Sequence, residues 1–106
     1  FNMNVKDNNT TTKTSTVLLD MISSRAERIE ELKDASEIDP LDVEYHVGSD
    51  NDIREIVLQL TAGGPTIDLY VYRGIIKGTM GGTRDRVHVQ NDPLMRGLRQ
   101  RYEPLL

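Results

Sequence analysis

The residues with the clearest capacity for chemistry lie where apolar and polar side chains alternate. Between residues 67 and 72, Ile, Leu and Val alternate with Asp68, Tyr70 and Tyr72. Successive side chains of a strand point to opposite faces, so we predict that the apolar set faces a core and the polar set shares the other face. The same alternation in neighbouring segments sends further polar side chains outward, namely His46, Gln59, Lys77, Thr79, Arg84, Arg86 and His88.

This predicted face suits two kinds of partner. Tyrosine rings stack on bases while Lys and Arg contact phosphates, which is how many proteins hold single-stranded nucleic acid. Tyr and Arg are also the usual anchors of a protein interface. Asp68 argues against a nucleic-acid partner, because its carboxylate would repel phosphate. In a purely structural alternative, the tyrosines pack against neighbouring strands of the sheet and bind no partner. The residues assigned to partner binding on this face are Tyr70, Tyr72, Lys77, Arg84 and Arg86.

Catalytic signatures are scarce. The glycine clusters lack the Gly-Lys-Ser/Thr continuation of a phosphate-binding loop, so we interpret Gly74 and Gly81 as turn residues. No serine lies in a nucleophile motif, and the chain has no cysteine. His46, His88 and Asp68 form one alternative, a metal or acid–base site built on adjacent strands. We predict a non-enzymatic protein with no catalytic residue, cofactor or metal.

The elements that position this face follow from the spacing of apolar residues. Helical spacing extends over residues 17–33, and after Pro40 the period becomes that of strands. Five strands are predicted at about residues 43–47, 56–60, 67–72, 75–80 and 84–90, and their short connections favour antiparallel pairing. Asp92-Pro93 begins a second helix, with Asp92 as its N-cap. We predict an α+β fold: an N-terminal amphipathic helix, a five-stranded antiparallel β-meander and a short C-terminal helix, forming one domain over residues 17–106 after a flexible arm over residues 1–16.

Charge is distributed unevenly, although the net charge of the 106 residues is only −4. Residues 20–55 carry 12 acidic and 4 basic side chains, whereas residues 73–101 carry 7 basic and 2 acidic ones. The acidic part is either ordinary solvated surface or a stripe that binds a partner. The candidate contacts of such a stripe are Glu27, Glu30, Glu31 and Asp34. No apolar run can span a bilayer and no cysteine demands an oxidising compartment, so we expect a cytoplasmic protein with no membrane partner.

Three segments carry a resemblance to a known group of proteins. They are Glu-Arg-Ile-Glu-Glu-Leu at 27–32, Asp-Pro-Leu-Asp-Val-Glu-Tyr at 39–45 and Leu-Gln-Leu-Thr-Ala-Gly-Gly-Pro at 58–65. Over residues 25–72 the chain resembles small uncharacterised phage and mobile-element proteins, which have a Glu-rich helix, an extended acidic segment and a strand ending in Thr-Gly-Gly-Pro. Ala62 interrupts that ending here, and Gly-Thr-Met-Gly-Gly at 78–82 replaces an aromatic-rich strand.

The resemblance implies a binding protein that acts stoichiometrically, as inhibitors of host CRISPR or restriction nucleases do. We therefore expect a non-enzymatic phage or mobile-element protein that inhibits or modulates a host nucleic-acid-processing or defence complex. Its partner would be a host protein or nucleoprotein complex. The alternative is a nucleic-acid-binding module that uses the Tyr/Arg face. An uncovered sheet edge or face also allows a homodimer.

Overall fold

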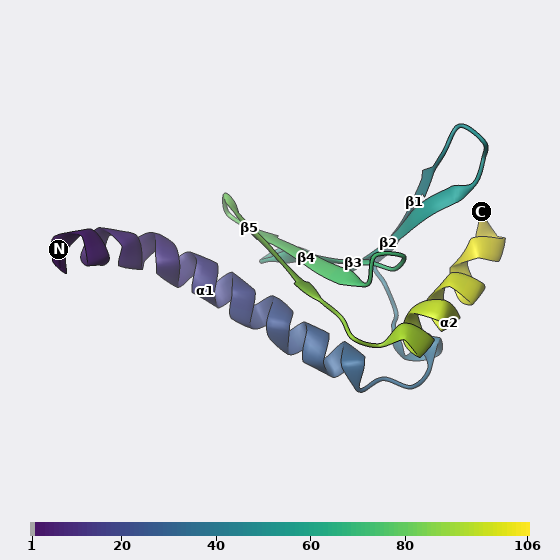
Figure 1. The fold of residues 1–106 in the computed structure, drawn as a ribbon, viewed down its shortest axis with the longest axis horizontal. Helices are drawn as coiled ribbons and strands as arrows, with labels where there is room; N and C mark the ends of the chain where they lie inside the picture. The colour runs from purple at the N-terminus through teal and green to yellow at the C-terminus, as the bar shows by residue number, and fades with distance from the viewer. Residues whose placement is uncertain (1) are drawn as a thin grey trace.

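A computed structural model describes residues 2–106, with side chains described from Thr16 onward. The elements are α1 (Asn2–Glu30), η1 (Ala35–Glu37), β1 (Asp42–Val47), β2 (Ile53–Thr61), β3 (Thr66–Tyr70), β4 (Ile75–Met80), β5 (Thr83–His88), α2 (Asp92–Tyr102) and η2 (Glu103–Leu105). The predicted α+β fold and its order of elements are confirmed (Figure 1). The arm predicted over residues 1–16 falls mainly outside the part with described side chains, so it stays a prediction.

The five strands form one antiparallel sheet in the order β1-β2-β3-β4-β5, which is the predicted meander. Gly74 (φ 65°) and Gly81 (φ 62°) occupy the left-handed conformation that the tight turns after β3 and β4 require. Glycine adopts this conformation without a Cβ clash, so the interpretation of these residues as turn residues is confirmed. β3 ends at Tyr70, two residues before its predicted end.

Both helices cover the same face of the sheet (Figure 1). The core joins α1, α2 and the inward side chains of the strands, and its fully buried members include Leu18, Ile22, Ile56, Leu58, Leu69, Ile76 and Leu98. Gly78 on β4 lets α1 lie close, because a Cβ there would meet Ile22 Cγ2 at 2.6 Å. From the other end of the sheet, Tyr45 donates a hydrogen bond to the carbonyl oxygen of Tyr102 at 2.6 Å. Within residues 2–106, no helix lies on the opposite face of the sheet.

Asn91 joins the end of one helix to the start of the other. Its Nδ2 donates to the carbonyl oxygens of Ile29, Glu30 and Leu32 at 3.0, 3.3 and 2.9 Å. Its Oδ1 accepts from the Leu94 amide at 3.2 Å, so Asn91 is the N-cap of α2. The prediction that Asp92 is the N-cap was wrong by one residue, because an asparagine can cap α2 and also donate to the carbonyls at the end of α1.

Substituting Asn91 tests this double role. We expect Asn91→Ala to lower the free energy of unfolding by about 2 kcal/mol, because it removes a helix cap and leaves carbonyls at the end of α1 without a donor. Asn91→Ser keeps an oxygen that can cap α2 and should recover about half of that loss. Urea denaturation followed by circular dichroism measures both variants. An unchanged midpoint for Asn91→Ala would contradict the proposed role.

Candidate functional site

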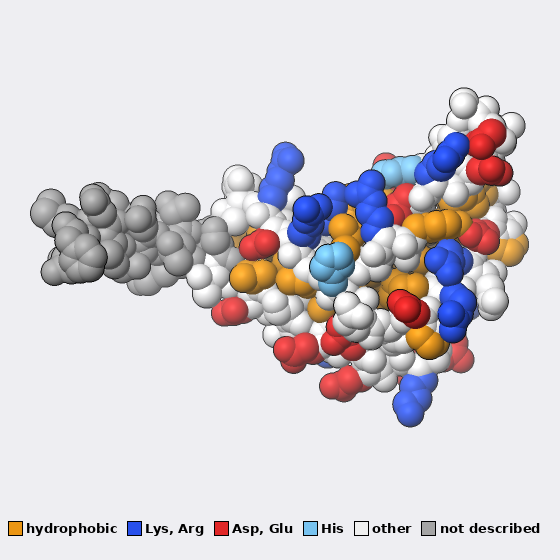
Figure 2. All heavy atoms as spheres, in the orientation of Figure 1, with side chains coloured by type: hydrophobic (Ala, Val, Ile, Leu, Met, Phe, Trp, Pro, Cys, Tyr) orange, Lys and Arg blue, Asp and Glu red, His pale blue; other side chains and the backbone are white. Residues whose placement is uncertain are grey.

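The uncovered sheet face presents the polar side chains in rows. The strand register aligns Asp42, Gln59, Asp68, Lys77 and Arg86 in one row across all five strands. The row is acidic on the β1 side and basic on the β4–β5 side. Figure 2 shows Lys and Arg side chains gathered over the strands, on the side of the molecule away from α1. The outward directions predicted by alternation thus place cations from two strands together.

An open groove of about 500 Å³ lies over β3, β4 and β5. Its lining includes Asp68, Tyr70, Lys77, Thr79, Arg84 and Arg86, and we call these six residues the sheet-face groove. The Lys77 Nζ atom lies 4.5 Å from the centroid of the Tyr70 ring, within the range of a cation–π contact. The groove therefore holds four of the five residues assigned to the face, all except Tyr72.

The cations of the groove are not held in ion pairs by the described residues, although Asp68 lies opposite Lys77 on the adjacent strand. Among the residues with described side chains, Lys77, Arg84 and Arg86 form no ion pair within 4.0 Å. Lys77 and Arg86 are direct partners on adjacent strands, an arrangement that costs stability for like charges. A bound anion would remove that cost.

Asp68 is the acidic member of the groove. Burial and the negative charge of Glu44 raise the pKa of the Asp68 carboxyl. Burial, followed by the charges of Asp68 and Glu44, also raises the pKa of Tyr70. The raised pKa favours the neutral form of Asp68, whereas its ionised form works against an anionic ligand, as its sequence position suggested.

Neutralising Asp68 should strengthen anion binding. Because the pKa of Asp68 is higher in the folded than in the unfolded chain, its neutral form favours folding at low pH, and that stability is lost as pH rises through the folded pKa. At pH 7 we expect an anionic ligand of this groove to bind Asp68→Asn about two- to fivefold more tightly than the unsubstituted chain, without loss of stability. Fluorescence anisotropy measures the affinity.

Asp42→Asn is the matched control for this substitution, because Asp42 lies in the same row but at the β1 edge. If Asp42→Asn increased the affinity more than Asp68→Asn, the anion would not be bound in the sheet-face groove.

Tyr72 does not share the groove with Tyr70, so the prediction of a common face was wrong for this pair. β3 ends at Tyr70, and residues 71–74 form the turn that takes Tyr72 to α2. There its hydroxyl donates to the Glu103 carboxylate, and Arg99 lies 5.3 Å from the ring centroid. Burial and the hydrogen bond to Glu103 raise the pKa of Tyr72 to about 12. Alternation along a strand gives no information once the strand has ended.

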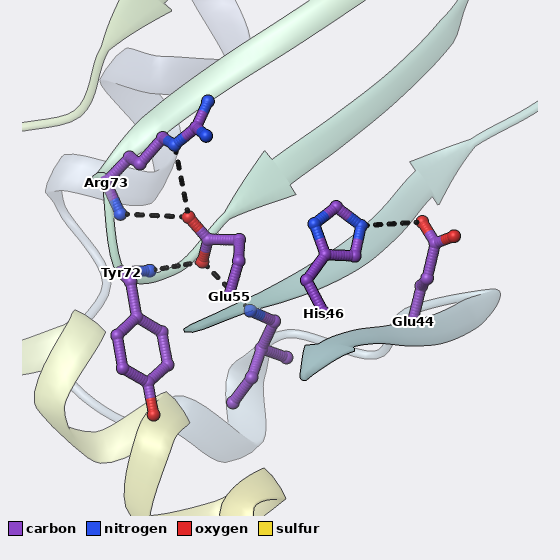
Figure 3. A network of polar contacts seen from close by, with 6 residues as sticks. Glu44, His46, Glu55, Tyr72 and Arg73 are labelled. Carbon is purple, nitrogen blue, oxygen red and sulfur yellow. Dashed lines mark hydrogen bonds and ion pairs between the residues drawn. The ribbon is translucent and has the colours of Figure 1, made fainter. Parts of the chain in front are cut away.

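Glu55 holds this turn in place, and its role was not predicted. Only 3% of Glu55 is exposed, and its carboxylate accepts hydrogen bonds from the amides of Tyr72 and Arg73 at 2.6 and 3.2 Å. It also accepts from the Ile56 amide, and the Arg73 Nε atom lies 3.8 Å away (Figure 3). In the sequence Glu55 is simply one more polar residue on an alternating strand, because its partners are 17 and 18 residues away.

The four acidic candidates do not form one helical stripe. α1 ends at Glu30, three residues before the predicted end, so Glu31 and Asp34 lie beyond it and only Glu27 and Glu30 are helical. The Glu30 carboxylate accepts a hydrogen bond from the Gln90 amide at 2.7 Å. Asp34 caps η1, and the hydrogen bond from the Ser36 amide lowers the pKa of its carboxyl. Two of the four side chains thus have partners within the chain.

The histidine alternative is wrong. β1 and β5 are opposite edges of the sheet, so His46 and His88 are separated by four strand spacings, roughly 19 Å. His46 instead lies 3.5 Å from Glu44 on its own strand (Figure 3). Among the residues with described side chains, no group of three His, Cys, Asp or Glu residues could hold a metal ion.

Comparison with known proteins adds no relative: no family model, no curated protein and no solved structure matches this chain. Within the described part of the chain, no helix has both the length and the apolar character needed to cross a membrane.

Proposed function

We propose that this chain is a non-enzymatic nucleic-acid-binding module whose sheet-face groove holds the backbone of a single strand. The observation that carries the proposal is a set of three cations beside Tyr70 in one open groove, for which residues 16–106 provide no ion-pair partner within 4.0 Å. Lys77, Arg84 and Arg86 contact phosphates in this proposal, and the Tyr70 ring offers an apolar surface to a base or sugar.

The proposal is tested by titrating labelled single-stranded DNA and RNA at several salt concentrations. Each phosphate neutralised by a cation releases counterions, so the logarithm of the affinity should fall linearly with that of salt, with a slope of about −2 for three contacts to a single strand. Failure to bind either nucleic acid at low salt would reject the proposal.

A second candidate function is docking on a protein of a host nucleic-acid-processing or defence complex. The acidic side of the same face favours it, because Asp42 and Glu44 lie across the sheet from Arg86 and His88 and a mixed-charge face suits a protein partner. The resemblance to phage and mobile-element proteins points to the same setting. Affinity capture from host lysate, with and without nuclease, separates the two candidates: a captured protein that survives nuclease treatment and is lost with Asp42→Lys/Glu44→Lys supports this one.

A further inference from the structure

A second group of cations lies where β5 meets α2. An open groove of about 370 Å³ is lined there by residues that include Arg73, His88, Arg96 and Arg99, and we call these four residues the junction groove. Arg96 and Arg99 are three positions apart on α2, so they project from neighbouring positions on the helix surface. Neither forms an ion pair among the residues with described side chains.

The outward side chains of β5 connect the two grooves. Arg84 and Arg86 line the sheet-face groove, and His88, two residues further along the strand, lines the junction groove. All three point to the same side of β5 and are exposed. Alternate residues of a strand are about 6.8 Å apart, so β5 presents a cationic or titratable group at regular intervals along the path between the grooves.

Figure 2 agrees with this path, because it shows Lys and Arg side chains both over the strands and at the α2 end of the same view. Acidic groups also line the two grooves. Asp68 and Asp85 line the first, and Asp92 lines the second, where Glu55 also lies beside Arg73. Asp85 alternates with Arg84 and Arg86 and pairs with Gly78, so its side chain points to the α1 face. On the outward face, three cations lie with Asp68 in the sheet-face groove, and three arginines lie with Asp92 and Glu55 at the junction groove, with His88 between the two grooves.

We infer that the two grooves and the outward side chains of β5 form one continuous track for a single-stranded nucleic acid, with the junction groove as a second phosphate-binding site. This inference rests on the proposed function, because the single-stranded nucleic acid must first occupy the sheet-face groove. It assigns phosphate contacts to Arg96 and Arg99, which lie outside the residues predicted from the sequence. A short oligonucleotide fills only the sheet-face groove, whereas a longer one also reaches the junction groove beside α2.

Oligonucleotide length distinguishes the two sites. Fluorescence anisotropy with labelled oligothymidylates of about 4 and about 12 nucleotides, which bracket common site sizes, compares the full chain with Arg96→Glu/Arg99→Glu. We expect the double variant to bind the longer strand at least about tenfold more weakly, with a salt slope smaller by about 1.4, and to bind the shorter strand as the unsubstituted chain does. Arg28→Glu/Lys33→Glu is the matched control, because it changes the charge equally near the end of α1.

The outcomes separate the inference from the proposed function. If Arg96→Glu/Arg99→Glu binds the longer strand unchanged, or if the control loses as much affinity, the track is wrong while the sheet-face groove stands. If the unsubstituted chain binds neither length, the proposed function fails. Circular dichroism checks the fold of each variant, and Arg96→Gln/Arg99→Gln replaces the double glutamate if that variant unfolds. The glutamine variant should show the same dependence on length with a smaller loss of affinity.

Discussion

Lys77→Glu/Arg86→Glu is expected to weaken the binding of a single-stranded oligonucleotide by at least about a hundredfold. The two residues are direct cross-strand partners and both line the sheet-face groove. Each charge-assisted contact to phosphate contributes about 1.5–3 kcal/mol, so the loss of two contacts corresponds to a factor of about 100 or more. The reversed charges would also repel the remaining phosphates. Fluorescence anisotropy at fixed salt measures the loss, and the salt slope should fall by about 1.4.

The same double variant should lose about 1–2 kcal/mol of stability and still fold. Two acids opposite each other repel about as strongly as the Lys77–Arg86 pair they replace, but Lys77→Glu also puts an acid opposite Asp68 and removes the contact of Lys77 with the Tyr70 ring. A cooperative thermal transition above the temperature of the binding assay therefore shows that lost binding is not lost folding. Arg28→Glu/Lys33→Glu again serves as the control of equal charge. Binding that falls equally in both double variants would show that net charge, not the groove, attracts the ligand.

Glu55→Ala is expected to lower the free energy of unfolding by about 3 kcal/mol. The carboxylate is nearly fully buried and accepts from two amides of the turn after β3. Removing it leaves those amides without an acceptor, and each buried donor left unpaired costs about 1–3 kcal/mol. The change is a large part of the stability of a domain this size. Urea denaturation monitored by tyrosine fluorescence and circular dichroism measures it.

Two further variants assign the source of that loss. Glu55→Gln keeps one carbonyl oxygen, so it should retain the bond from Tyr72 and lose about half as much as the alanine variant. Arg73→Gln removes a 3.8 Å ion pair and a cation–π contact with Tyr70 at 5.9 Å, both made by a largely exposed side chain and together worth about 1 kcal/mol. If Arg73→Gln were as destabilising as Glu55→Ala, the ion pair and not the turn amides would be the important contact.

The fold was predictable because its signals are local. Helical spacing in α1 and α2, alternation in the strands and glycines in the tight turns each depend on residues close in sequence. Short connections then leave little choice but neighbour-to-neighbour pairing, so the meander follows. Errors occurred at the ends of elements. α1 stops at Glu30 and α2 is capped by Asn91, because hydrogen bonds between the two helix ends, 59 to 62 residues apart, decide where each begins and stops.

The candidate site was predictable only where alternation continued. Tyr70, Lys77, Arg84 and Arg86 lie together because the register of β3, β4 and β5 follows from their turns. Tyr72 lies elsewhere because its strand ended, and Glu55, Arg96 and Arg99 gained their positions from contacts between distant segments. No single-residue signal marks Glu55, whereas the spacing of Arg96 and Arg99 on a predicted helix does place them on one side of it.

The hydrogen bonds of Asn91 also bear on how the molecule opens. Since one side chain satisfies carbonyls at the end of α1 and an amide at the start of α2, neither helix end can fray without releasing the other. Amide protons in the last turn of α1 and the first turn of α2 should therefore exchange with solvent at matched rates, as one cooperative unit. The β1–β2 hairpin tip is remote from this junction, so its amides should exchange earlier and independently (Figure 1).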